Sequence, residues 1–377
     1  MTMKFKILHS FGKDSEEWRN LIRQLKPEGQ DIHFIPEYGN VYRLTYGYQP
    51  FLVFYGNEAH FIIQTFVKRP LHELSFLKEQ NITEPFYDIA NPYGYGGPIC
   101  CCSTLEEGQQ LFKQLNSNLI DYCRQNKIAS EFTSFHPLLD NQRYVLGTGL
   151  IELNFQKKII YWDLTLSEEE LWRKISRGHK SGINKARRNG VWVEKVNPDS
   201  ANLKMFKDLY DQTMLRHRAA SKWFFPDNYF ENLLFQLGTQ RFSLFFAWAN
   251  SALAAGFLLI HDFHTVYYHF GGSDHQYHTL RPSNLLMWEV ALWAKRNGFL
   301  RFHLGGGVTS SATDSLFQFK SGFSDRYAAL YSYQRVHNRE IYEYLCSLKR
   351  NHERMKGESN DSDYFPFYRR KRLLNRS

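Results

Sequence analysis

The sequence lacks any apolar run long enough to cross a membrane. No segment comes near the roughly 18 uninterrupted apolar residues that a spanning helix requires. The N-terminal stretch MTMKFKILHSFGKDSEEW also lacks the apolar core of a signal peptide. We therefore expect a cytoplasmic protein, either in solution or at the inner face of the membrane.

Cysteine is scarce, with five residues, and three of them form the run at 100–102. Such a run does not close local disulfides in normal geometry. The odd count and irregular spacing favour a reducing compartment. The five histidines between 261 and 278 span a turn, a strand and a loop, without a tight ligand pair and cysteine partners. We therefore expect no metal site.

Three widespread motifs are missing as well. The chain has neither a G-x-G-x-x-G segment nor a Walker sequence, which disfavours Rossmann and P-loop interpretations. It also has no G-x-S-x-G elbow, which disfavours a catalytic serine triad.

Aromatic residues and positive charge are abundant. Aromatics make up 16% of the 377 residues, which favours sheet-based cores, and the length favours two domains. Much of the net charge of +9 comes from residues 173–188 and 369–376. This charge implies a weak attraction for phosphates, nucleic acid or an anionic membrane, and no specific partner.

The order of predicted elements occurs twice along the chain: helices, hairpin strands, a glycine-rich strand end, a long helix and a strand. The first set comprises a helix at 18–25, paired strands at 43–71, a glycine-rich loop at 91–101, a helix at 105–126 and a strand at 131–139. The second set begins with helices near 167–189 and 199–217 and a strand meander at 241–270. We expect a tandem α+β fold, with domains at 1–155 and 156–346 and a charged, partly flexible tail at 347–377.

Two strands with glycines at their ends flank a predicted helix in the second half. Leu285, Trp288, Leu292 and Trp293 recur at helical spacing, so we expect one face of this helix to be buried. Ser283 and Asn284 are good N-cap residues for this helix, and Gly298 is typical of its end. Glycines beside a helix N-terminus suit a phosphate or a polarised carbonyl, because backbone N–H groups are accessible there. The alternative, that Gly271–Gly272 and Gly305–Gly307 only form turns, stays open.

The segment RKISRGHKSGINKARRNG at 173–190 holds seven Lys or Arg residues. Lys180, Lys185, Arg187 and Arg188 are candidates for binding an anionic substrate, whether a pyrophosphate or a polynucleotide. The alternative is a solvated basic helix with a small apolar inner face.

The segment DSLFQFKSGFSD at 314–325 contains a single lysine, Lys320, in an aromatic setting. A cation there can stabilise a phosphate or a developing oxyanion. The alternative is a surface lysine whose apolar stem packs on the protein.

The stretch from YHFGGSD at 268–274 through LFQFKSGFSD at 316–325 resembles the C-terminal signature of Fem-type peptidoglycan-bridge aminoacyltransferases. It is equally similar to their BioF2-like or GNAT-type acetyltransferase relatives. The segments at 92–98, 173–194 and 210–233 match the same superfamily, so the resemblance reaches both halves up to about residue 345.

This resemblance implies two GNAT-like domains, each with a mixed, mostly antiparallel sheet flanked by helices. In the second domain the activated acyl donor binds where two neighbouring strands splay apart, beside a helix N-terminus. The matching positions here are Gly271–Gly272 and the helix start with Arg281, Ser283 and Asn284.

Lys320 matches the lysine of the F-K-x-G-F motif, which lies at the active site of Fem-type enzymes. Two features depart from the family pattern. His303 stands where many relatives carry an acidic residue, and LRPSN is not the full coenzyme-A pyrophosphate loop. The long charged heptad arm of some Fem-type enzymes is also missing.

The resemblance implies acyl transfer from acyl-CoA, or alternatively from aminoacyl-tRNA, to an amine of a cell-envelope saccharide or peptide precursor. Tyr93, Tyr95 and the basic helix are the expected acceptor contacts, and neither a metal nor DNA is expected to take part. Asp314 is the catalytic partner we assign to Lys320, although Asp274 and Glu289 are also candidate bases.

A third interpretation is a non-catalytic, basic binding protein on a degenerate scaffold. A strand-end gap plugged by side chains such as His269 and His303 would favour it. The basic C-terminal tail also suits a peripheral contact with a membrane.

Overall fold

The computed structural model describes residues 2–357 and 364–370. The chain forms two compact units, one made of residues 1–155 and 331–377 and the other of residues 156–330. Among the described residues, none of the helices combines the length and the apolar character that crossing a membrane demands.

The first unit contains a mixed sheet with the strand order β1-β2-β3-β4-β6-β13, and β5 pairs with β3. Neighbouring strands are antiparallel except for β4 and β6, which are parallel. The strands are β1 (Lys4–His9), β2 (Gln49–Gly56), β3 (Phe61–Pro70), β4 (Tyr87–Ala90), β5 (Ile99–Cys101), β6 (Ile128–Ser134) and β13 (Arg326–Val336).

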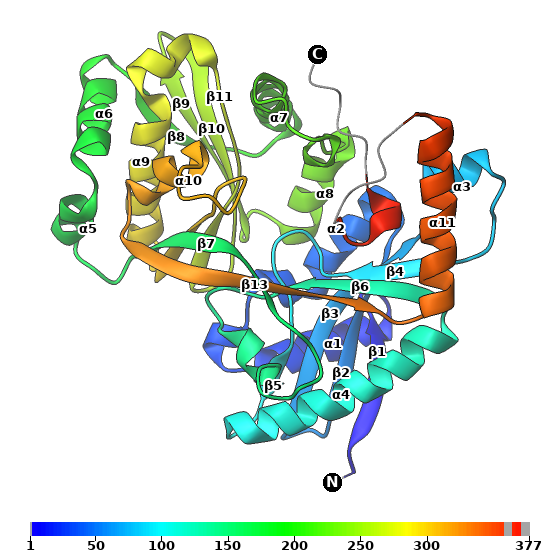
Figure 1. Cartoon of the computed structure of the whole chain (residues 1–377). Coiled ribbons are helices and arrows are strands. Elements are labelled where there is room, and N and C mark those ends of the chain that lie inside the picture. The colour runs from blue at the N-terminus through cyan, green and yellow to red at the C-terminus, as the bar shows by residue number, and fades with distance from the viewer. Residues whose placement is uncertain (1, 358–363, 371–377) are drawn as a thin grey trace. The chain divides into compact units, whose positions relative to one another are not determined.

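One long helix covers a face of this sheet (Figure 1). The helices of the unit are α1 (Lys13–Gln24), α2 (Pro36–Tyr46), α3 (Ser75–Glu79), α4 (Leu105–Gln125) and α11 (Arg339–Met355). Leu111, Leu115 and Leu119 recur at helical spacing on α4 and pack in one cluster with Phe51 and Val53 of β2. The burial of this stripe fixes α4 on the sheet.

The described residues of the predicted C-terminal tail are folded. Residues 347–355 complete α11, and the side chains of Phe367 and Tyr368 are buried in a cluster with Phe76 and Leu345. Residues 358–363 and 371–377 of the predicted tail lie outside the described residues.

The second unit contains a sheet with the order β7-β12-β11-β10-β9-β8. β11 and β12 are parallel, and the other neighbours are antiparallel. The strands are β7 (Asn154–Asp163), β8 (Trp192–Val196), β9 (Phe242–Ala249), β10 (Ala252–His261), β11 (Thr265–Ser273) and β12 (Arg301–Gly305).

Helix α9 lies on this sheet, and α6 packs on the outer side of α9 (Figure 1). The helices are α5 (Glu168–Lys174), α6 (Arg177–Arg188), α7 (Ser200–Arg216), α8 (Asp227–Leu237), α9 (Pro282–Arg296) and α10 (Ser315–Ser321). The predicted apolar stripe of α9 is buried at Leu285, Trp288 and Leu292, in one cluster with Phe245 and Phe257 of the sheet. Gly298, with φ +82°, follows the helix as predicted.

Two predicted elements have different bounds in the structure. Residues 43–46 end helix α2 instead of beginning a strand. The single helix predicted near 167–189 is divided into α5 and α6, because Ile175 is extended and the Ser176 hydroxyl caps the new helix at His179 N.

Candidate functional site

β11 and β12 separate at their carboxyl ends. They pair only where Thr265–Tyr267 lies beside Arg301–His303. Beyond this point β11 continues to Ser273 along β10, whereas β12 stays with β7 up to Gly305. A short 3-10 helix at His275–Leu280 connects β11 to α9. The N-terminus of α9 therefore lies near the carboxyl end of β11, where β11 and β12 separate.

A bulge lies in β11 at the point of separation. Tyr268 pairs with Leu259 and Phe270 with Leu258, so β11 has one extra residue, His269. Bulges bend a strand and increase its twist, which accounts for the divergence of β11 from its neighbour. The His269 ring lies 4.2 Å from that of Phe270, and its Nε2 is 3.4 Å from the Tyr229 hydroxyl of α8.

Gly271 and Gly272 lie within β11, before its last residue. A Cβ on Gly271 would lie 1.9 Å from the Tyr268 hydroxyl oxygen, and a Cβ on Gly272 would lie 2.9 Å from the Leu209 carbonyl oxygen of α7. Both glycines therefore have a packing role. Donor binding at these two residues stays a prediction.

The start of α9 differs in detail from the sequence prediction. The N-cap is Arg281, in the left-handed region at φ +61°, and Pro282 takes the first helical position. The prediction of Ser283 or Asn284 as the cap is therefore wrong. Asn284 is buried against Gly182 of α6, Ser283 is half-buried, and Arg281 is exposed at the helix start.

The glycine loop after β12 binds two ammonium groups through its carbonyls. Lys320 Nζ donates to Gly306 O at 3.1 Å, and Lys157 Nζ donates to Gly307 O at 2.7 Å. Gly305 has φ +77°, which only glycine adopts readily. Two lysine side chains therefore lie together at the end of β12. Nothing in the sequence indicated that Lys157 would contact this loop.

Lys320 lies between the two diverging strands. Its Nζ is over the Tyr268 ring of β11 at 4.9 Å and contacts the loop that follows β12, and the residue is only 5% exposed. Burial lowers the pKa of Lys320 to about 7, with a further contribution from the Lys157 charge. At neutral pH this amine is therefore divided between its charged and neutral forms.

Asp314 caps helix α10 beside the two lysines. Its carboxylate accepts hydrogen bonds from Thr309 N at 2.9 Å and Phe317 N at 3.0 Å. Burial acts to raise the pKa of Asp314, but these hydrogen bonds hold it below its usual value. Asp314 is therefore an ionised counter-charge to Lys157 and Lys320, which is a poor starting point for accepting a proton.

The other two candidate bases also have structural partners. Glu289 forms an ion pair with Arg187 of α6 at 2.8 Å. Asp274 accepts a hydrogen bond from Gln276 N at 2.9 Å.

Helix α6 presents most of its positive charge to solvent. Gly182, Ile183 and Ala186 face inward, whereas Lys185 and Arg188 are exposed. Of the other two predicted ligands, Arg187 contacts Glu289, and Lys180 Nζ donates to Arg173 O at 3.0 Å. The exposed pair is thus the more accessible part of the predicted anion site.

In the first unit, the loop at 91–98 is fixed by neighbouring tyrosines. The Tyr38 hydroxyl donates to Tyr93 O at 2.6 Å, and Tyr93 N donates to the Tyr42 hydroxyl at 2.8 Å. The Tyr93 side chain is exposed, whereas the Tyr95 ring lies edge-on to His33 at 5.1 Å. The loop therefore holds one tyrosine out for contact and one packed beneath.

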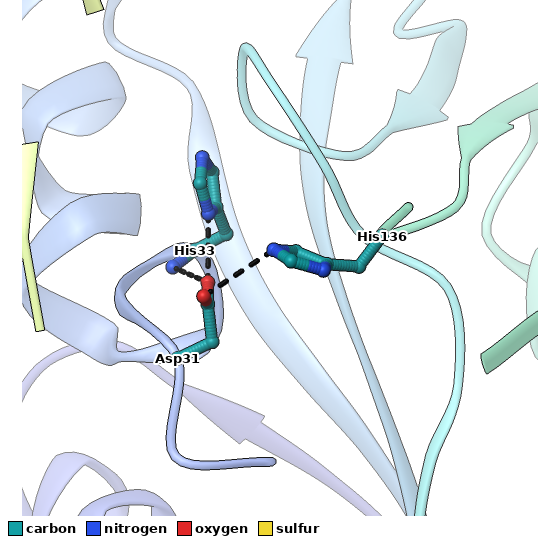
Figure 2. A group of neighbouring side chains, drawn as sticks. All are labelled: Asp31, His33 and His136. Atoms are coloured by element: carbon teal, nitrogen blue, oxygen red, sulfur yellow. Dashed lines mark hydrogen bonds and ion pairs between the residues drawn. The ribbon is translucent and has the colours of Figure 1, made fainter. Parts of the chain in front are cut away.

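A buried cluster of Asp31, His33 and His136 lies beside Tyr95, and both imidazoles point at the carboxylate (Figure 2). His33 Nδ1 is 2.7 Å from Asp31 Oδ1, and His136 Nε2 is 3.3 Å from Asp31 Oδ2. Burial acts to raise the pKa of Asp31, but the two histidines hold it well below its usual value.

The three side chains are close enough together to hold a metal ion. However, Leu138 N donates to His136 Nδ1 at 3.2 Å, so the ring proton belongs on Nε2, where it donates to Asp31. A metal would need that Nε2 lone pair. The hydrogen bonds therefore fit a structural network under the loop. No local pattern in the sequence indicates it, because His136 lies about a hundred residues from Asp31 and His33.

Comparison with protein families identifies the second unit. Residues 173–321 match the acetyltransferase (GNAT) domain family. The chain carries a GNAT domain. The match includes the separating strands β11 and β12, helix α9 and Lys320.

Solved structures extend this likeness to both units. The crystal structure of FemX has a TM-score of 0.67 at 14% identity, covering 91% of this chain and 99% of that one. A tandem GNAT protein from the clavulanic acid biosynthesis pathway has a TM-score of 0.53 at 7% identity, covering 89% and 99%. A conserved protein of unknown function from Bacteroides thetaiotaomicron also reaches 0.53, at 11% identity, covering 88% and 99%.

At these identities the likeness concerns the fold. A sequence comparison with curated proteins finds no match. The predicted α+β fold with tandem GNAT-like domains is confirmed, and the predicted resemblance to GNAT-superfamily acyltransferases of the Fem type is confirmed at the level of the fold.

Proposed function

We propose that this protein transfers an acyl group from an activated donor to an amine of a cell-envelope saccharide or peptide precursor. The observation that carries the proposal is the placement of Lys320 between the diverging β11 and β12 of a GNAT domain. A buried ammonium costs stability, so its retention in a gap between strands argues for a chemical role.

In the proposed reaction, the acceptor nitrogen attacks the donor carbonyl carbon, and the carbonyl oxygen becomes an oxyanion. Lys320 in its charged form donates a hydrogen bond to that oxyanion. The thiolate or ribose oxygen of the donor then leaves, and the nitrogen loses a proton. Because Lys320 stays charged while it holds the oxyanion, this proton passes from the nitrogen to solvent water.

We propose acyl-CoA as the donor. The N-terminus of α9 lies at the end where β11 and β12 separate, and Arg281 is exposed beside it. Backbone N–H groups with an arginine suit a pyrophosphate. The second candidate is an aminoacyl-tRNA ester, which is favoured by the fold likeness to FemX over 91% of the chain.

We propose two sets of acceptor contacts. Tyr93 is held outward by a fixed loop in the first unit, with Tyr95 beneath it. Lys185 and Arg188 offer exposed positive charge on α6 in the second unit. These groups suit an anionic saccharide precursor, whether small or lipid-linked, because tyrosine rings pack on sugars and cations attract phosphates.

Thermal unfolding with acetyl-CoA, coenzyme A or charged tRNA distinguishes the donors. A ligand at about 100 times its dissociation constant adds about 2.7 kcal/mol to the stability. We expect the two coenzyme-A compounds to raise the melting temperature. If neither does, while charged tRNA is consumed in the presence of a muropeptide precursor, the aminoacyl-tRNA alternative replaces our proposal.

A further inference from the structure

Two cysteines of the first unit line a polar pocket at the start of helix α4. The pocket has a volume of about 220 Å³ and is lined by Cys100, Cys102, Lys26, Arg143 and Tyr144, together with residues 103–105. Residues two apart on a strand project from the same face, so the thiols of Cys100 and Cys102 share the pocket. It lies outside the proposed acyl-transfer machinery.

The Cys101 thiol makes a contact outside this pocket. Its Sγ lies 3.5 Å from the carbonyl oxygen of Ala59, which accepts the S–H hydrogen bond. The remaining cysteines, Cys123 and Cys346, are buried. The chain therefore contains one pair of thiols at a pocket. The reactivity of this pair can be compared with that of the three other thiols in the same chain.

Several donors converge on Cys102. The Cys100 thiol, the Tyr144 hydroxyl and the charge of Arg143 all act to lower the pKa of Cys102. Arg143 Nη2 donates to the Tyr144 hydroxyl at 3.0 Å, and the Tyr144 ring and the Cys102 sulfur both lie against Gly108. The arrangement therefore favours a thiolate.

The first turn of α4 adds to this effect. A Cβ on Gly108 would lie 3.1 Å from Cys102 Sγ, so the thiol contacts the N-terminal part of a 21-residue helix. A helix N-terminus favours negative charge. The hydrogen bond from Cys100 and the other donors outweigh burial and the nearby Glu107, and they lower the pKa of Cys102 to about 7.

We propose that Cys102 undergoes thiol–disulfide exchange with small anionic disulfides. The Cys102 thiolate attacks one sulfur of the small disulfide, a new S–S bond forms, and the other sulfur leaves as a thiolate. No other oxidant is required. The exposed Lys26 and Arg143 at the pocket attract carboxylate groups on the incoming molecule.

The test uses the full chain and two reagents of opposite charge, the dianionic Ellman reagent and the dicationic cystamine. Each rate is divided by the rate of the same reagent with the urea-unfolded chain. We expect one fast thiol per chain with the anionic reagent, and a roughly tenfold lower normalised rate with cystamine at low salt. The difference should shrink at about 1 M salt, where charges are screened within about 3 Å.

The pH profile and three variants complete the test. The fast rate should rise with increasing pH and reach half of its maximum near pH 7, whereas the rate of an ordinary cysteine reaches half of its maximum at about pH 8.5. Cys102→Ser should remove the fast phase, Cys101→Ser should keep it, and Lys26→Gln, on the surface, should reduce the charge preference. A fast phase that survives Cys102→Ser, or equal normalised rates for both reagents, would overturn the proposal.

Discussion

The substitution Lys320→Met tests the central residue through stability as well as activity. Burial lowers the pKa of Lys320 from 10.5 in the unfolded chain to about 7 in the folded protein. Each unit of pKa corresponds to about 1.36 kcal/mol, so holding the charged amine inside costs about 4 kcal/mol at pH 7, where half of it is protonated. Methionine removes this cost and loses the hydrogen bond to Gly306 O, which contributes about 1 kcal/mol.

We therefore expect Lys320→Met to be about 3 kcal/mol more stable than the wild type at pH 7. Between pH 7 and 10.5 the unfolded chain binds more protons at this residue than the folded protein does, so wild-type stability rises with pH. The advantage of the variant should thus shrink by about 2 kcal/mol at pH 9. Turnover should fall by roughly 10²-fold, the scale of a lost oxyanion donor.

Urea unfolding of both proteins at the two pH values measures these differences directly. Lys158→Met is the matched control, because Lys158 is an exposed lysine on β7, and its replacement should leave stability nearly unchanged. A Lys320→Met protein that is less stable than the wild type at pH 7, with a difference that does not change with pH, would refute the reasoning.

Three further variants test other parts of the account. Replacing Lys185 and Arg188 by Gln should weaken binding of an anionic acceptor steeply at low salt and less at high salt, as titrations at several salt concentrations would show; equal affinity at low salt would support a solvated face. Asp31→Asn should lower the free energy of unfolding, measured with urea, by about 3 kcal/mol, because it removes a buried charge that is hydrogen-bonded to two histidines. This difference from the wild type should disappear as the pH falls through the low folded pKa of Asp31. Gly306→Ala should destabilise the loop and reduce activity, since its Cβ would lie 2.8 Å from Lys158 O; a fully active, equally stable variant would contradict the close packing.

Local patterns predicted the strand–helix–strand unit well. The apolar spacing of Leu285, Trp288 and Leu292 and the position of Gly298 depend on near neighbours in the chain, and all four lie as expected. The F-K-x-G-F motif singled out Lys320 because a lone lysine among aromatics is itself a local signal.

Features that depend on distant contacts or unusual backbone could not be predicted in this way. Arg281 adopts a left-handed conformation that is uncommon outside glycine, so Ser283 was the more reasonable N-cap. Lys157 reaches the glycine loop only because β7 pairs with β12, strands that lie far apart in the sequence. Gly272 was predicted to admit a ligand, but α7 packs against it.

Acyl transfer itself provides the most direct test of the account. Wild-type protein is incubated with acetyl-CoA or with charged tRNA, together with an amine-bearing muropeptide precursor, and the precursor is analysed by mass spectrometry. We expect the wild type to acylate the precursor from acetyl-CoA, Lys158→Met to do so at the same rate, and Lys320→Met to be slower by roughly 10²-fold. Equal transfer by the folded Lys320→Met protein, or no transfer by the wild type from either donor, would contradict the account.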